Sequence, residues 1–174
     1  IALYLPQGFE LPKTDRRVIG HTGAADIVGT VELALKLAPE ARRLYIVSGA
    51  HKVDRGVEEK ARRDLKKWEH RLEFRSLSAR PFEEILTAVS SAPPEDIVLL
   101  LGVAAAAIGR TYTTREAATK LAAVSRGAVF GLYDVALGNG IAGGSLVSFE
   151  RIGANAGQLI LDILRGGVGP NLLP

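Results

Sequence analysis

The residues best suited to chemistry lie in three loops, and each loop follows an apolar run of strand length. The runs are LYIVS (44–48), IVLLL (97–101) and AVFGL (128–132). Eight candidate ligand-binding residues share this placement: His51, Asp54, Arg55, Arg110, Thr111, Tyr133, Asp134 and Gly140. Cations, carboxylates and an aromatic ring over a small apolar floor suit the noncovalent capture of a small organic molecule. The other interpretation is that Asp54 only caps a helix, Asp134 only forms a turn and His51 is an exposed loop residue.

A glycine-rich stretch follows the last of these runs and matches the dinucleotide-binding pattern G-x-G-x-x-G from Gly138 to Gly143. That pattern indicates a dinucleotide site when it leaves a strand directly and opens a helix. Here five residues separate Leu132 from the first glycine, and residues 145–149 are typical of extended chain. We therefore predict a turn whose glycines allow positive φ angles and a close approach of the backbone to a ligand or to the sheet.

Metal, nucleophilic and acid–base sites have characteristic spacings, and the sequence shows none of them. The three histidines are scattered and there is no cysteine, so we predict no metal site. Neither Ser48 nor Ser145 has the flanking glycines of a nucleophile elbow. The adjacent pairs Glu58-Glu59 and Glu83-Glu84 are expected on helices, mostly facing water. The sequence thus predicts binding without catalysis and without a cofactor.

Composition limits the classes of protein to which this chain can belong. Its 174 residues suffice for about one domain. The 22 Lys and Arg residues barely exceed the 19 Asp and Glu residues, and the basic run at 60–67 is typical of a solvated helix face, so we predict no nucleic-acid partner. The longest apolar run, residues 97–108, is shorter than the roughly 20 residues that span a bilayer. Because the chain begins at Ile1 and contains no methionine, we interpret it as a fragment of a longer protein.

The elements that must position these loops alternate along the chain. Strands are predicted at 44–48, 72–77, 97–101 and 128–132, and helices after Asp26, from Asp54, from Pro81 and from Thr113 or Thr114. A last helix is predicted over about 150–164, burying Ile152, Ala156, Leu159, Ile160 and Ile163. Residues 1–5 are predicted to form an edge strand or a crossover segment. This alternation indicates an α/β fold: a parallel sheet with helices on both faces and residues 97–101 at its centre.

Two segments carry a resemblance to a known fold. They are DIVGTVELALKLAPEARRLYIVSGAHKVDRG (26–56) and TYTTREAATKLAAVSRGAVFGLYDVALGNGIAGGSLVSFERIGANAGQLILDILRG (111–166). Together they resemble the type I periplasmic binding proteins, and the likeness extends from about Val18 to Gly166. The closer likeness is to the substrate-binding-like sensor domains of bacterial histidine kinases and to the ABC transporter substrate-binding family. Members have two lobes around a ligand cleft, and the resemblance implies that loops 51–55, 110–112 and 133–134 face that cleft.

The resemblance also implies a division of the chain and a function. Residues 18–174 would form one Rossmann-like ligand-binding lobe, and residues 1–17 would be a crossover or edge segment of a first lobe. Transporter-type members usually place a polar residue or Asp directly after the central strand, whereas this chain has Gly102-Val103 and an alanine run. This departure speaks against amino-acid binding and leaves a more apolar ligand, or no ligand, as the alternatives. We expect an extracytoplasmic, membrane-anchored sensor domain that works with its own first lobe and a downstream signalling module, with a homodimer as a further option. The alternatives are the solute-binding protein of an ABC transporter and an α/β enzyme that uses a nucleotide or sugar phosphate.

Overall fold

A computed structural model of the protein describes residues 2–6, 20–103 and 111–166. The chain divides into two compact units: Asp26–Val147 forms one, and Ile1–Ala25 together with Ser148–Pro174 forms the other. The border predicted between residues 17 and 18 lies outside the described residues. Of the described residues, 20–25 and the last helix belong to the same unit as residues 2–6. Among the described residues, no helix has both the length and the apolarity to cross a membrane.

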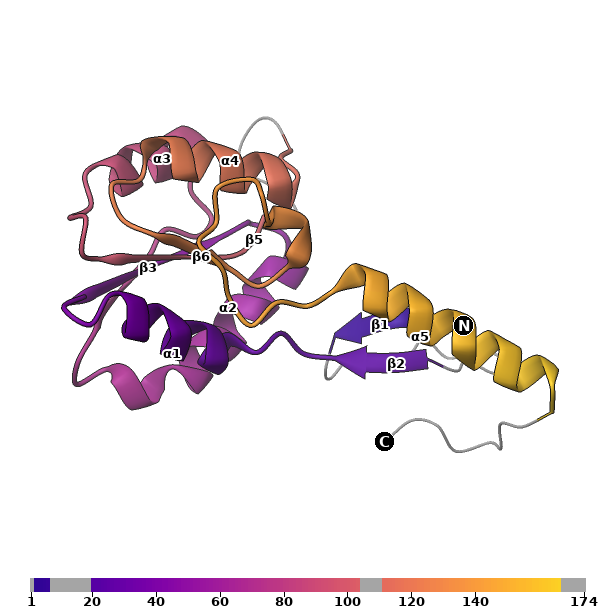
Figure 1. The fold of residues 1–174 in the computed structure, drawn as a ribbon. Helices are drawn as coiled ribbons and strands as arrows, with labels where there is room; N and C mark the ends of the chain where they lie inside the picture. The colour runs from indigo at the N-terminus through magenta and orange to yellow at the C-terminus, as the bar shows by residue number, and fades with distance from the viewer. Residues whose placement is uncertain (1, 7–19, 104–110, 167–174) are drawn as a thin grey trace. The chain divides into compact units, whose positions relative to one another are not determined.

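The unit Asp26–Val147 is built on a four-stranded parallel sheet, as the sequence predicted. Its strands are β3 (Arg43–Ser48), β4 (Glu73–Ser76), β5 (Ile97–Gly102) and β6 (Val129–Gly131), in the order β4-β3-β5-β6. The helices between them are α1 (Ile27–Leu37), α2 (Lys52–Asp64), α3 (Phe82–Ser90) and α4 (Thr114–Val124). Figure 1 shows α1 and α2 on one face of the sheet and α3 and α4 on the other. The α/β fold with helices on both faces is therefore confirmed.

Local sequence explains where these helices begin. The Asp26 carboxylate accepts a hydrogen bond of 2.8 Å from the Gly29 amide, which caps α1. At the start of α4, Thr113 and Glu116 form a capping box, with the Glu116 amide 3.1 Å from the Thr113 hydroxyl oxygen. The caps predicted at Asp26 and Thr113 are confirmed. The cap predicted at Asp54 is wrong, because the N-cap of α2 is His51 and Asp54 is three residues further on.

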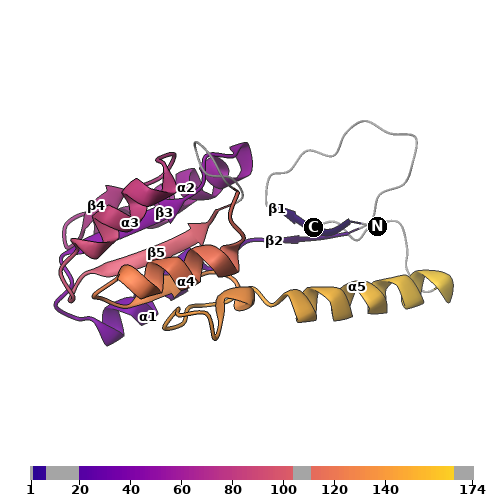
Figure 2. The same cartoon turned by 90° about the horizontal axis from the view of Figure 1, so that it is seen from above.

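The core lies on both faces of the two inner strands, β3 and β5. Successive side chains of a strand point to opposite faces, so a continuous apolar run can bury both sides. Tyr45, Val47, Val98 and Leu100 belong to the cluster that includes residues of α3 and α4. Leu44, Ile46 and Leu99 have no exposed surface and alternate with them along the strands. Figure 2 looks onto the face that α3 and α4 cover.

The outer edge of β6 is covered by the chain that follows the glycine-rich turn. Residues 143 and 147 form parallel bridges with Phe130 and Tyr133, and the Gly131 amide donates to the Gly143 carbonyl over 3.0 Å. A Cβ on Gly144 would lie 2.0 Å from the Gly131 carbonyl oxygen, so only glycine fits there. The predicted turn with close backbone approach to the sheet is thus confirmed.

The second unit pairs two short strands with one long helix. β1 (Ala2–Pro6) and β2 (Gly20–Gly23) are parallel, and α5 (Phe149–Leu164) contacts β1. The α5 helix begins at Phe149, directly after the Ser148 cap and one residue before the predicted start. Of its five residues predicted to be buried, Ala156 and Leu159 are buried and Ile152 and Ile163 are half-buried. Ile160 is 38% exposed, so that prediction is wrong.

Candidate functional site

The loop after β3 is tied into the start of α2. His51 Nδ1 accepts from the Val53 amide over 3.3 Å, and the Asp54 carboxylate accepts from the His51 amide over 3.2 Å. When Nδ1 of a neutral histidine accepts, the proton lies on Nε2, so His51 presents an exposed Nε2–H donor. Asp54 is buried, whereas the exposed Arg55 donates to the Ala50 carbonyl over 2.9 Å. Of these three candidate residues, His51 and Arg55 are accessible to a solute.

The segment after β5 is described only in part. Gly102 ends the strand with a φ of +143°, a conformation that favours glycine. Arg110 lies outside the described residues. Thr111 is exposed, and Tyr112 stacks on Phe82 with ring centroids 4.3 Å apart. Tyr112 therefore belongs to the packing of α3, and Thr111 is the accessible candidate of this segment.

The segment after β6 places Tyr133 and Asp134 at the same edge of the sheet. Tyr133 precedes a short 3₁₀ helix, η2 (Asp134–Ala136), and both residues are half-buried. The Asp134 amide donates to the Val147 carbonyl over 3.1 Å, which holds the backbone irrespective of the side chain. A Cβ built on Gly102 would lie 3.6 Å from Cε2 of Tyr133. The Tyr133 ring is thus next to the end of β5.

Gly140 has a structural explanation that the sequence did not indicate. Its φ is +101°, and a Cβ at this position would lie 2.3 Å from the Cβ of Ala122 on α4. The close approach is to a helix, and it accounts for glycine here without any ligand. The G-x-G-x-x-G stretch also opens no helix, because the next one begins at Phe149.

Three strand-end segments therefore meet at Gly102. The Gly49 amide donates to the Gly102 carbonyl over 3.0 Å, which joins the loop after β3 to the end of β5. The Tyr133 ring approaches the same glycine from the segment after β6. We call this edge the carboxyl rim and define it by Gly49, His51, Gly102, Tyr133 and Asp134. Its accessible groups can hydrogen-bond, pair with a charge and stack, which is the chemistry of solute binding.

Glu58 on α2 is a buried charged residue. It was predicted to face water, yet it is 8% exposed. Its Oε1 accepts from the Ser76 hydroxyl over 2.7 Å and from the Arg62 guanidinium over 2.9 Å. Burial raises the pKa of Glu58, but hydrogen bonds from Ser78, Ser76 and Arg62 outweigh it and hold that pKa below its usual value. The i,i+4 spacing of Glu58 and Arg62 indicates their ion pair from the sequence. Nothing in the sequence indicates that Ser76 and Ser78 also contact Glu58.

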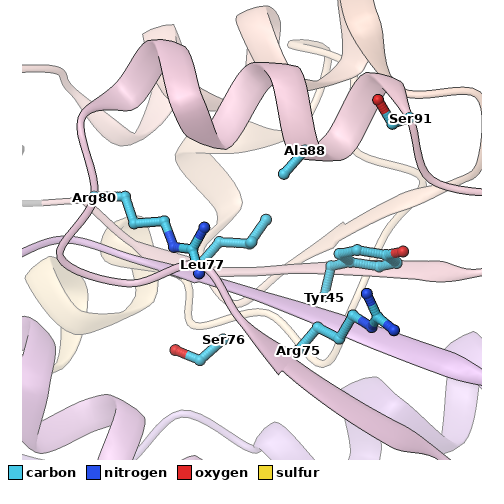
Figure 3. Close-up of a pocket in the computed structure, with 7 residues that line it drawn as sticks. All are labelled: Tyr45, Arg75, Ser76, Leu77, Arg80, Ala88 and Ser91. Atoms are coloured by element: carbon cyan, nitrogen blue, oxygen red, sulfur yellow. The ribbon is translucent and has the colours of Figure 1, made fainter.

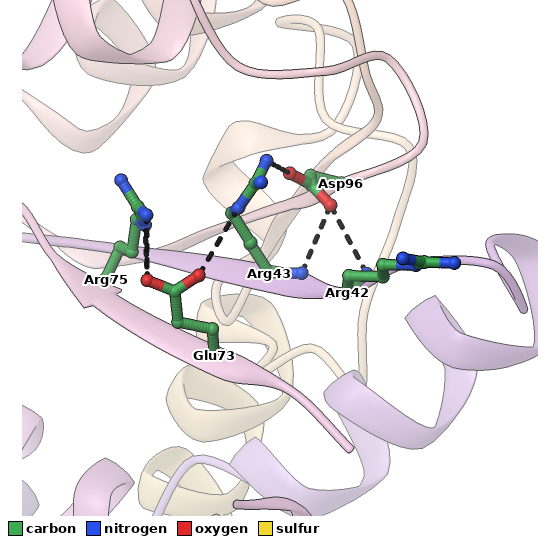
Figure 4. A network of polar contacts seen from close by, with 5 residues as sticks. All are labelled: Arg42, Arg43, Glu73, Arg75 and Asp96. Carbon is green, nitrogen blue, oxygen red and sulfur yellow. Dashed lines mark hydrogen bonds and ion pairs between the residues drawn. The ribbon is translucent and has the colours of Figure 1, made fainter.

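A second polar network lies at the amino ends of the strands, away from the carboxyl rim (Figure 4). The buried Asp96 accepts from the backbone amides of Arg42 and Arg43 over 3.3 and 3.1 Å, and from the Arg43 guanidinium over 3.1 Å. Glu73 bridges Arg43 and Arg75. These contacts hold the starts of β3, β4 and β5 together, so we interpret the network as structural.

A cavity of about 530 Å³ opens between α3 and the edge strand β4. Figure 3 shows the seven residues that line it: Tyr45, Arg75, Ser76, Leu77, Arg80, Ala88 and Ser91. None of the predicted site residues is among them. In the part of the chain that the structure describes, no cluster of three or more His, Asp or Glu side chains could hold a metal ion.

Comparison with known proteins identifies structural neighbours. No protein-family model matches the sequence, and no curated protein matches it significantly. A conserved domain protein from Vibrio cholerae matches with a TM-score of 0.61 and 16% identity, over 85% of this chain and 48% of its own. An ABC domain from Streptococcus pneumoniae, solved in complex with L-Trp, matches with a TM-score of 0.62 and 15% identity, over 90% of this chain and 51% of its own. These likenesses agree with the α/β fold, and the chain spans about half the length of each neighbour.

Proposed function

We propose that this protein holds a small organic solute at the carboxyl rim and does not transform it. The observation that carries the proposal is the meeting of three strand-end segments at Gly102. Open α/β sheets bind their ligands outside the carboxyl ends of the strands, where loops from neighbouring strands converge. This convergence supports a single site built from segments that lie more than 80 residues apart in the sequence.

The groups at the rim favour a solute with an aromatic or apolar part and a charged end. The Tyr133 ring and the glycine beside it offer a flat surface on which a ring can stack. The Asp134 carboxylate would pair with an ammonium group, and the His51 Nε2–H would donate to a carboxylate. An aromatic amino acid combines these features. The L-Trp in the Streptococcus pneumoniae neighbour supports choosing that amino acid as the first probe, although 15% identity relates the two folds only.

The periplasmic-binding-like family provides the proposed mechanism. A second lobe of the whole protein would close over the occupied rim, and the solute would shift the population toward the closed form by its greater affinity for that form. We propose that this closure serves as the extracytoplasmic input of a bacterial signalling protein, with transport as the second candidate. The full-length gene product separates the two. A sensor would continue into a transmembrane helix and an output module, whereas a transport protein would end soon after the second lobe.

A ligand screen followed by mapping tests the binding proposal. We expect L-Trp or a related aromatic solute to raise the melting temperature, and to shift the ¹H–¹⁵N resonances of Gly49, Gly102 and Tyr133 in a saturable way. ATP and NAD belong in the same panel. Stabilisation by a nucleotide would favour the enzyme alternative. Saturable shifts confined to residues away from the rim, or no binder in the panel, would contradict the proposal.

A further inference from the structure

The cavity between α3 and β4 is lined by two polar groups that have no hydrogen-bond or ion-pair partner among the residues that the structure describes. Tyr45 is only 7% exposed, yet its hydroxyl forms no hydrogen bond within the described chain. Arg80 lies in the loop before α3, and no described residue forms an ion pair with its guanidinium. Every buried polar side-chain atom of the described residues has a partner, so the Tyr45 hydroxyl is not sealed in the core but opens to the cavity that Tyr45 lines, where a solute can reach it.

The remaining lining residues complete a small amphipathic pocket. Leu77 and Ala88 provide an apolar surface between Tyr45 and Arg80 (Figure 3). Arg75, the strand neighbour of Tyr45, is already paired with Glu73 at 2.8 Å, so its charge is largely compensated. Ser76 and Ser91 donate their hydroxyl hydrogens to Glu58 and Thr87. The unpaired positive charge of the pocket is therefore that of Arg80.

We propose that this pocket is a second ligand site, independent of the carboxyl rim, that binds a small organic carboxylate with a hydrogen-bonding group at its far end. Arg80 pairs with the carboxylate, the apolar body of the ligand lies on Leu77 and Ala88, and the Tyr45 hydroxyl bonds to the far group. The volume of about 530 Å³ is in the range of small-molecule sites. An extended peptide added to the edge of β4 is the competing occupant. It fits less well, because the exposed Glu73 and Arg75 side chains lie along that edge.

Three matched probes test the two contacts separately. Terephthalamate carries a carboxylate and an amide at opposite ends of a ring, terephthalamide lacks the carboxylate, and benzoate lacks the amide. We expect terephthalamate to bind with a dissociation constant near the millimolar range, as suits a probe of this size. It should cause saturable ¹H–¹⁵N shifts at Leu77, Ala88 and Ser91. Terephthalamide should bind about tenfold more weakly and benzoate about threefold more weakly, because a charged hydrogen bond contributes more than a neutral one.

Two variants assign the contacts to residues. Arg80→Gln should make terephthalamate and terephthalamide bind equally, and Tyr45→Phe should make terephthalamate and benzoate bind equally. Tyr45→Phe removes an unpartnered hydroxyl, so the fold should keep its spectrum and its stability. Arg63→Gln, an exposed arginine on α2, is the matched control and should leave binding unchanged.

Several outcomes would overturn this second site. The first is the absence of saturable shifts up to about 10 mM probe, which is roughly ten times the expected dissociation constant. The second is equal binding of all three probes to the wild-type protein. The third is that both variants still distinguish between the probes as the wild type does. Shifts at Gly49, Gly102 and Tyr133 in place of the pocket residues would also reject it, while supporting the carboxyl rim. Binding of an extended acidic peptide along β4, without binding of terephthalamate, would favour the peptide interpretation.

Discussion

At the scale of single residues, the half-buried Asp134 carboxylate at the carboxyl rim is the feature most directly open to test. Asp134 begins η2, and its backbone amide bonds to the Val147 carbonyl, a contact that does not depend on the side chain. Asp134→Ala should therefore weaken binding of the solute found in the screen about tenfold, because it removes a charged partner. The melting temperature should hardly change. Calorimetric titration and thermal unfolding measure both quantities, with Glu95→Ala, an exposed acid at the opposite end of β5, as the control. Loss of the fold would instead show that Asp134 is a structural turn residue.

Glu58 allows a prediction about pH. The folded-state pKa of Glu58 is lowered from 4.5, so its charged form contributes stability above that pH, and the contribution is lost as the pH falls through the folded pKa. Glu58→Gln should reduce the free energy of unfolding by about 1–3 kcal/mol at pH 7, since charged hydrogen bonds become neutral ones. The difference between the two proteins should shrink as the pH drops below 4.5.

Urea unfolding of both proteins between pH 3 and pH 7 provides the measurement for Glu58, at about half-unit steps so that the titration is resolved. Glu59→Gln is a closely matched control, because Glu59 is the next residue of α2 and is exposed. It should behave as the wild type throughout. A stability gap between wild type and Glu58→Gln that does not depend on pH would contradict the assignment of the effect to the charge.

At the scale of elements, the turn after η2 depends on a glycine that approaches α4. Gly140→Ala combines a left-handed φ with a contact of 2.3 Å to the Cβ of Ala122, and should lower stability by roughly 2–4 kcal/mol. Gly138→Ala tests the φ effect alone, because Gly138 has a φ of +72° but open space around its Cβ position; we expect a loss of about 1 kcal/mol. Chemical denaturation compares the two variants. Equal losses would mean that the contact with α4 contributes nothing. A bulky residue at Gly140 would therefore disturb the fold whatever the protein binds.

The position of β4 at the edge of the sheet explains where the cavity lies. β4 is at one end of the strand order, and α3 follows it in the sequence before the chain enters the inner strand β5. The other outer strand, β6, is covered by the bridges at residues 143 and 147, whereas no described strand pairs with the free side of β4. The cavity that contains the Tyr45 hydroxyl therefore opens at the uncovered end of the sheet.

At the scale of the whole molecule, the two units differ in how completely they bury a core. Residues 26–147 have a four-stranded sheet with helices on both faces, a combination that supports independent folding. We expect the isolated segment 26–147 to unfold cooperatively in urea and to retain the dispersed ¹H–¹⁵N spectrum of the full chain for the same residues. A collapsed spectrum without a cooperative transition would show that this unit needs the other to fold.

Most of the fold could be predicted from short-range patterns. Apolar runs of strand length, helical periodicity and the caps at Asp26 and Thr113 depend on residues within one or two turns of each other. The same patterns placed the loops after β3, β5 and β6, since parallel strands bring their carboxyl ends to one edge. The choice of His51 over Asp54 as N-cap was not predictable, because both residues suit a helix start and the chain path before α2 decides between them.

The amino-acid sequence alone was sufficient for the class of fold, the inner position of 97–101 and the set of loops that meet at Gly102. The spatial arrangement was needed for the burial of Glu58 against Ser76, for the contact of Gly140 with Ala122 and for the unpartnered hydroxyl of Tyr45. The physical reason is the separation along the chain of the residues that interact. Hydrophobic periodicity and helix capping involve residues that are close in the sequence. Burial and hydrogen-bond satisfaction depend on residues that the topology brings together from distant parts of the chain.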